Sequence, residues 1–179
     1  MASKIKVDTL ETANGSGTIA LSNQLSGMTT ASLPALGSAQ MPSGSVLQVV
    51  NLHLTTQTAT SGTSYVDSGI TLSITPYSTS SKVFVTVTVG GFEIGSSRFS
   101  MYTNLVRGST QIFQPNGYVG FPAGSTRTFP ATSYSFLDSP ATTSSTTYKV
   151  QFKGAGGSGA VTLNVNASES TITLMEIQG

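Results

Sequence analysis

The sequence predicts an all-β protein: an antiparallel β-sandwich of jelly-roll-like form, preceded by a short extended N-terminal segment. Fifty-five of the 179 residues are Ser or Thr, and 19 Gly and 7 Pro add to the turn-forming residues that punctuate the chain. About eight short segments after residue 42 alternate apolar and polar side chains, which is the period-two pattern of half-buried strands. No segment has the apolar spacing of an amphipathic helix.

The expected strands begin at residue 46, and clusters of Gly, Pro, Ser and Thr separate them. Residues 46–54 are predicted to form a buried strand, because four apolar side chains share one face: Val46, Val50, Leu52 and Leu54. Residues 83–89 carry Val at every second position, and residues 148–153 alternate apolar side chains with Lys and Gln. The other expected strands are 70–74, 99–106, 111–113, 128–137, 161–165 and 171–177, with a hairpin turn at 107–109 and a flexible turn at 154–159. This count favours an eight-stranded jelly roll and leaves the strand order open.

Residues 1–41 differ in composition from residues 42–179, so we expect two parts. The first part has few large apolar residues and no aromatic one, and a segment of this size rarely folds without a partner. Ile5, Val7 and Leu10 lie in a strand-like stretch, and residues 14–17 form the expected turn of a hairpin-like element. We therefore expect residues 1–41 to be an oligomerisation segment and linker, and residues 42–179 to be the sandwich head.

The chain is poor in charge. Charged residues make up 8% of it, against about 25% in an average soluble protein. Its surface must therefore consist mainly of hydroxyls and amides, or be covered by other subunits. The eight basic residues are scattered and the net charge is +1, which argues against nucleic-acid binding. Without an apolar run of membrane-spanning length or a signal-peptide pattern, we expect neither membrane insertion nor secretion by the usual route.

Catalytic and metal-binding groups are scarce. His53 is the only imidazole, it lies in an apolar strand, and no Gly-x-Ser-x-Gly motif accompanies it, so a structural His is the favoured interpretation. The chain has no Cys, and its seven acidic residues form no calcium-loop pattern. We expect no enzyme activity, no cofactor and no metal site.

Two groups of side chains are candidates for contacts with other molecules. Tyr118, Phe121 and Arg127 lie in an aromatic, Gly/Pro-rich stretch that is suited to stacking sugar rings or contacting a partner. The alternative, which we favour, is that the aromatic rings of this stretch cap one end of the core. Met175 and Ile177 share one face of the last expected strand, and they form a candidate subunit interface if the opposite face fills the core. A strand with core on both faces fits them equally well.

Several motifs point to a family. The N-terminal motif is Lys4-Ile5-Lys6-Val7-Asp8-Thr9-Leu10-Glu11-Thr12, followed by Gly15-Ser16-Gly17-Thr18-Ile19 and Leu25-Ser26-Gly27-Met28. Later motifs are Thr63-Ser64-Tyr65-Val66-Asp67, Ser80-Ser81-Lys82-Val83, Val106-Arg107-Gly108-Ser109-Thr110 and Leu137-Asp138-Ser139-Pro140-Ala141. Together they resemble tail-fibre-like virion structural proteins of tailed bacteriophages, notably marine ones.

The resemblance implies a virion component without enzymatic residues, commonly a homotrimer, assembled in the host cytoplasm and released by lysis. Ile5, Val7 and Leu10 would then attach the chain to other tail or capsid proteins, and the head would contact a host-surface glycan or protein. Since the chain has no shaft, heptad or collagen-like repeat, it would form a short spike. The alternatives are a capsid decoration or head-fibre protein without a receptor role and, further away, a carbohydrate-binding module.

Overall fold

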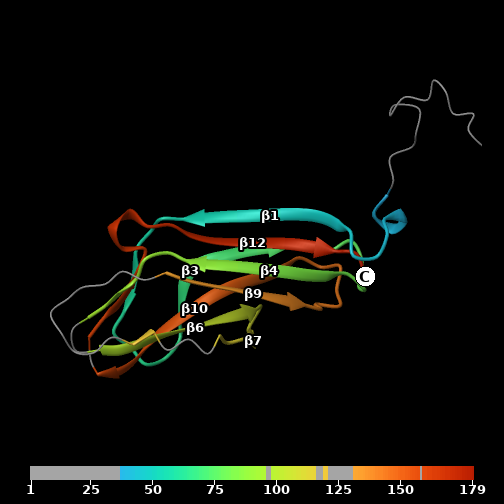
Figure 1. Cartoon of the computed structure of the whole chain (residues 1–179). Helices are drawn as coiled ribbons and strands as arrows, with labels where there is room; N and C mark the ends of the chain where they lie inside the picture. The colour runs from blue at the N-terminus through green and yellow to red at the C-terminus, as the bar shows by residue number, and fades with distance from the viewer. Residues whose placement is uncertain (1–36, 96–97, 116–118, 121–130, 158) are drawn as a thin grey trace, which may run out of the picture. The chain divides into compact units, whose positions relative to one another are not determined.

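The computed structural model describes residues 37–95, 98–115, 119–120, 131–157 and 159–179. These residues belong to one compact unit, residues 37–179, whose main elements are strands (Figure 1). The expected hairpin-like element within residues 1–41 lies outside the described residues, so the predicted boundary at 41/42 remains a prediction.

Two antiparallel sheets make up the head. The first has the order β1-β12-β4-β9 and consists of Val46–Leu54, Ser170–Ile177, Lys82–Val89 and Thr132–Asp138. The second has the order β3-β10-β6-β7 and consists of Val66–Ile74, Thr146–Gly157, Arg98–Arg107 and Thr110–Phe113, with β8 (Val119–Gly120) also paired to β6. A smaller sheet joins β2 (Thr58–Thr60), β11 (Val161–Leu163) and β5 (Glu93–Ile94), and two 3₁₀ turns span Ser38–Gln40 and Val165–Ala167.

The strand pairs are nested along the chain. The first long strand pairs with the last (β1 with β12), β3 pairs with β10, β4 with β9, and β6 with its neighbour β7. This is the arrangement of a long antiparallel hairpin rolled into two facing sheets, which defines a jelly roll. The predicted fold class, an antiparallel jelly-roll sandwich, is confirmed.

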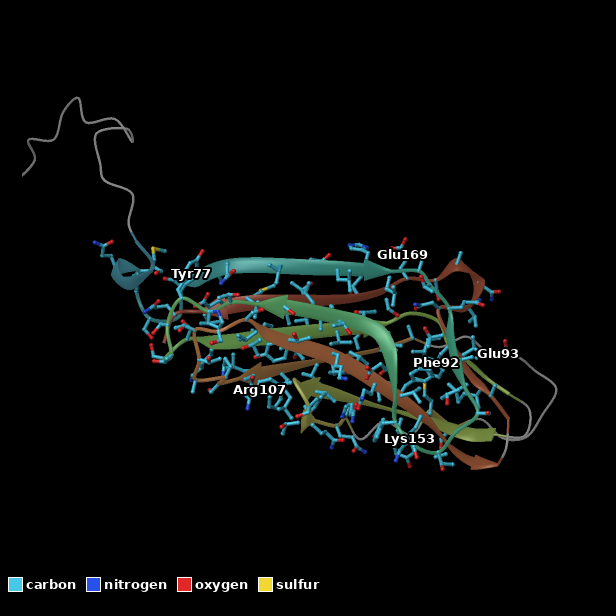
Figure 2. All side chains as sticks on the ribbon, turned by 180° about the vertical axis from the view of Figure 1, so that it is seen from behind. Tyr77, Phe92, Glu93, Arg107, Lys153 and Glu169 are labelled. Carbon is cyan, nitrogen blue, oxygen red and sulfur yellow. The ribbon has the colours of Figure 1, made fainter. Side chains whose placement is uncertain are left out.

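The core lies between the two sheets, as the alternation predicts. In β4 the side chains of Val83, Val85 and Val87 are buried, and the intervening residues are half-buried. Tyr148, Val150 and Phe152 of β10 face them with no exposed surface. Each such side chain contributes about 1.5–3 kcal/mol when it is removed from water. The same core includes Phe92 and, from the small sheet, Val161 and Leu163. Figure 2 shows Phe92 and Glu93 at the end of the head opposite Tyr77.

Some local expectations were wrong. The strand at residues 46–54 lies at the edge of its sheet, where β12 is the one strand paired with it among the described residues, so none of its residues is fully buried. Residues 161–165 do not form one strand: Asn164 adopts a left-handed backbone (φ 56°), and Val165 begins a 3₁₀ turn. Gly154, expected in a turn, lies within β10 opposite Met101.

Candidate functional site

The only imidazole lies at the surface. His53 occupies an outward position of β1, its side chain is 65% exposed, and its Nδ1 lies 3.4 Å from Glu169 Oε2, which is also exposed. Figure 2 shows Glu169 at the edge of the head, far from Arg107 and Lys153. His53 thus lies within the expected strand, and its side chain faces solvent. Among the described residues, Glu169 is the one side chain placed beside His53, so no nucleophile completes a catalytic triad there.

No group of three or more His, Asp or Glu side chains within the described ranges is placed to hold a metal ion. The described residues also contain no helix long and apolar enough to cross a membrane.

A buried network joins the two sheets at one end. The Arg107 guanidinium lies 2.8 Å from both carboxylate oxygens of Asp138, and the Tyr148 hydroxyl donates to Asp138 Oδ2 at 2.7 Å. Arg107 and Tyr148 belong to the second sheet, while Asp138 ends β9 of the first sheet. Burial, and then the hydrogen bond to Asp138, raises the pKa of Tyr148 well above its ordinary value of 10. Because Arg107 and Tyr148 both bind Asp138 across the two sheets, the network stabilises the sandwich.

The network also includes the first residue of the turn at residues 107–109. The hairpin turn is confirmed, and Gly108 there adopts the positive φ of 59° that favours glycine. Its arginine is bound to Asp138 and to the carbonyl of Ser139, so this side chain is not presented to a partner.

The outer face of the second sheet carries a polar and aromatic cluster. Lys153 Nζ lies over the rings of Tyr65 and Tyr102, at 4.5 Å and 5.6 Å from the ring centroids. Next to it the amide of Gln151 and the ammonium of Lys149 bind Asp67, and these hydrogen bonds hold the pKa of the Asp67 carboxyl below its ordinary value. Because the Lys153 ammonium already lies over the rings of Tyr65 and Tyr102, these ring faces are not free to stack against a sugar.

Only part of the aromatic stretch lies within the described residues. Phe113 stacks on Phe136 with centroids 5.2 Å apart and contacts Tyr134 at 5.7 Å, and all three pack against the core. For these three rings the expected packing against the core is confirmed, but Phe136 and Tyr134 lie opposite Val85 and Val87 along β4 and do not cap one end. The candidate ligand residues of this stretch, Tyr118, Phe121 and Arg127, lie outside the described residues, as do the candidate attachment residues Ile5, Val7 and Leu10.

A row of apolar side chains crosses the outer face of the first sheet. Val49 is paired with Met175, Met175 with Phe84, and Phe84 with Leu137, so each of the four strands contributes one residue at the same level. Their neighbours along each strand point into the core, so these four side chains point away from it. Val49 is 54% exposed and Leu137 49% exposed at the two edges of the row.

A second apolar pair lies beside this row. The register of β1 against β12 shifts between Val46 and Gln48, with Leu47 as the additional residue. The bulge brings Gln48 opposite the inward-facing Glu176 and turns Val46 outward, opposite Ile177. Val46 is consequently 50% exposed, so the expectation that it shares the buried face of its strand is wrong.

We call the six outward side chains the apolar band: Val46, Val49, Phe84, Leu137, Met175 and Ile177. Met175 and Ile177, the candidate interface residues, therefore lie on the outer face, half-buried, while Ile172 and Leu174 fill the core. The two-sided core alternative for this strand does not hold. Sequence reasoning missed the other four members, because they come from three other strands and meet only through the strand order.

The rest of this outer face is polar and, apart from Lys82, carries no permanent charge. Beyond the apolar row, the next level contains Asn51, Thr173, Thr86 and Ser135, and the following one His53, Thr171, Thr88 and Ser133. Hydroxyls and amides bind one another there, for example Asn51 Nδ2 to Thr173 Oγ1 at 2.7 Å. Among the outward residues of the four strands, Lys82 is the only permanently charged one.

No protein-family model matches the chain, and no curated protein matches it. Solved structures of infectious bursal disease virus proteins are similar to it. The VP2 subviral particle has a TM-score of 0.40 and 12% identity over 80% of this chain and 41% of that chain. T=1 particles derived from the virus have a TM-score of 0.29 and 14% identity over 81% and 41%, and the Gx strain 0.28 and 16% over 80% and 42%.

The chain thus spans less than half the length of these viral proteins. Similarity at this level assigns no function, and the jelly-roll assignment depends on the strand pairing alone.

Proposed function

We propose that this chain is a non-enzymatic virion structural protein of a tailed bacteriophage, a short spike-like component that displays a jelly-roll head. The single observation that carries the proposal is the apolar band, whose edge residues Val46, Val49 and Leu137 are each about half exposed on a sheet that otherwise carries hydroxyls and amides. Apolar surface gathered on one face of a charge-poor protein favours a role in an assembly over a role as an isolated domain.

The resemblance of the N-terminal motif to fibre-like virion proteins supports a virion as the assembly to which the chain belongs. Under this proposal residues 1–41 attach the chain to other tail or capsid proteins, with Ile5, Val7 and Leu10 as contact residues. The head then projects as one copy of a homotrimer. Several weak contacts on linked heads raise the overall affinity for a host surface by about 10²–10⁴ when they engage together.

Electron microscopy of virions labelled with an antibody against the head tests this function. We expect regular labelling of purified particles, and labelling of the tail supports a spike with an attachment role. Labelling of the capsid instead supports the decoration or head-fibre function. Particles without label, and without peptides of this chain in mass spectrometry, would refute a virion function.

A deletion of residues 1–41 separates the two proposed parts. The shortened chain should keep the circular dichroism of a folded β head and should no longer be incorporated into virions. Incorporation at the level of the full chain would refute the assignment of attachment to this segment. A host-glycan function for the head is tested by glycan-array binding that is lost on Tyr118→Ala or Phe121→Ala substitution.

A further inference from the structure

We propose that the apolar band is the surface through which one copy of the head binds a second copy of the same chain. The inference rests on the proposed function, since a spike subunit is displayed in several copies. It adds a two-fold contact between two heads through one sheet face, which is distinct from the three-fold contacts within a homotrimer. The occupant is argued from the area of this face, its charge and the place where the N-terminal segment joins the head.

The six side chains of the band lie next to one another, and the most exposed of them belong to the two edge strands. Half-buried Phe84 and Met175 form the middle of the row, and Val49 and Leu137 extend it to both edge strands. Tyr77, 60% exposed, lies at the end of the head where β1 begins (Figure 2). Among the described residues, the large apolar side chains that are exposed are therefore all at one end of the head.

The area of the face fits a stable contact. Four strands about 4.8 Å apart, each about eight residues long with a rise of about 3.4 Å, present a flat face of roughly 500 Å². Two such faces bury on the order of 1,000 Å², which is about the area at which specific protein interfaces begin. Apolar side chains then occupy one end of the contact and hydroxyls and amides the other.

The charge of the face fits a copy of itself better than a different, charged partner. Two copies that meet through the same patch bring identical charges together, which is costly when the patch is charged. Here the permanently charged outward residue is Lys82, at the end of its strand and opposite Ile177 of the band, while the Thr, Ser and Asn side chains of the face are neutral. The electrostatic opposition to self-association is therefore limited to one lysine per copy.

The path of the chain brings copies together at this end. The backbone of residues 44 and 45 is hydrogen-bonded to the backbone of Gln178, just beyond β12. The chain therefore enters the head beside Val46 and Ile177. Thirty-six residues precede the first described residue, Gly37. If these N-terminal segments bind one virion site together, they tether the bands of neighbouring heads close to one another, which raises their effective concentration.

The test compares two matched double variants of the full chain by size-exclusion chromatography with light scattering. Val49→Lys with Leu137→Lys introduces charge at the edges of the band, and Thr71→Lys with Thr110→Lys introduces it at exposed positions of the second sheet, outside the proposed contact. Circular dichroism and thermal melting establish that each variant is folded.

We expect an oligomer for the unmodified chain and for the control variant, and a monomer for the band variant at the same micromolar concentration. A monomeric unmodified chain, a band variant that stays oligomeric, or a control that dissociates equally would overturn the assignment. If the band variant misfolds, the single variant Val49→Thr should still weaken association while retaining the thermal transition, and unchanged association there would also overturn it. Virion labelling separates the two proposals: a labelled virion with a monomeric chain refutes only the band contact, and an oligomer absent from virions refutes only the virion function.

Discussion

Gln48 donates its side-chain amide to the buried carboxylate of Glu176 at 2.6 Å, directly beside the register shift that turns Val46 outward. The second carboxylate oxygen accepts the backbone N–H of Tyr77 at 2.8 Å, and Gln48 Nε2 also donates to the carbonyl of Thr75. One buried carboxylate thus links the start of β1, the end of β12 and the loop between β3 and β4. These bonds hold Gln48 on the inward side and thereby fix Val46 on the outward side.

Glu176→Ala should destabilise the head, because it leaves the Tyr77 N–H and one of the two N–H groups of the Gln48 amide without an acceptor. We expect a loss of about 2–3 kcal/mol in the free energy of unfolding, since each buried donor left unsatisfied costs about 1–3 kcal/mol. Urea denaturation measures it, with Thr171→Ala on the outer face of the same strand as the control. Equal midpoints for the two variants would show that the carboxylate does not anchor this end.

Asp138→Ala should cost more than an outward substitution in the same strand. It removes the shared acceptor of Arg107 and Tyr148, which joins the two sheets. Because Arg107 is 32% exposed, we expect about 2–4 kcal/mol, somewhat less than the loss on breaking a fully buried ion pair. Ser135→Ala is the matched control in β9. The account of this network is wrong if both substitutions shift the urea midpoint equally.

Stability should fall at alkaline pH. Burial raises the pKa of Tyr148 above its ordinary value of 10, and burial does the same for Tyr134. Below pH 10 these tyrosines hold their protons in both states. Above it the unfolded chain releases protons that the folded chain keeps, so the free energy of unfolding decreases as pH rises, by up to about 1.4 kcal/mol per pH unit for each group.

The substitution Tyr148→Phe removes both the hydrogen bond to Asp138 and the titrating hydroxyl, and the two effects on stability appear at different pH. At neutral pH we expect a loss of about 1.5–3 kcal/mol, because a bond to a carboxylate disappears. Between about pH 8 and about pH 11 the variant should lose less stability than the unmodified chain, because one of the titrating groups is gone. Urea unfolding across this range provides the comparison, and parallel pH curves would contradict the account.

His53→Ala should leave the head unchanged. The side chain is exposed and its contact with Glu169 is long, so we expect a change within about 0.5 kcal/mol. Thermal melting and virion incorporation are the measurements. Lost incorporation with unchanged stability would reveal a function of this imidazole that its surroundings do not indicate.

Alternation along single strands was enough to predict which residues face the core. Val83, Val85 and Val87 are buried as their spacing indicates, as are Ile172 and Leu174, because a strand places every second side chain on one face. This local rule also placed Met175 and Ile177 together on the opposite face. It needs no knowledge of the neighbouring strands.

The band as a whole could not be predicted, because it depends on pairing between distant strands. Val49 and Met175 are more than a hundred residues apart, and only the nested strand order makes them neighbours. The bulge beside Gln48 breaks the period-two rule within one strand, so Val46 was assigned to the wrong face. Likewise, apolar Val165 continued the expected pattern, and the left-handed backbone at Asn164 ended the strand.

The central claim, that the head assembles through the apolar band, is tested most directly by protection of a single thiol. The chain has no Cys, so Leu137→Cys places one reactive group on the outer face of the first sheet and Thr71→Cys places one on the second sheet. The rate of reaction with a polar thiol reagent is measured for each variant at concentrations below and above assembly. The account predicts that the thiol at position 137 reacts severalfold more slowly in the assembled state while the thiol at position 71 keeps its rate. Equal rates at position 137 in both states would contradict it.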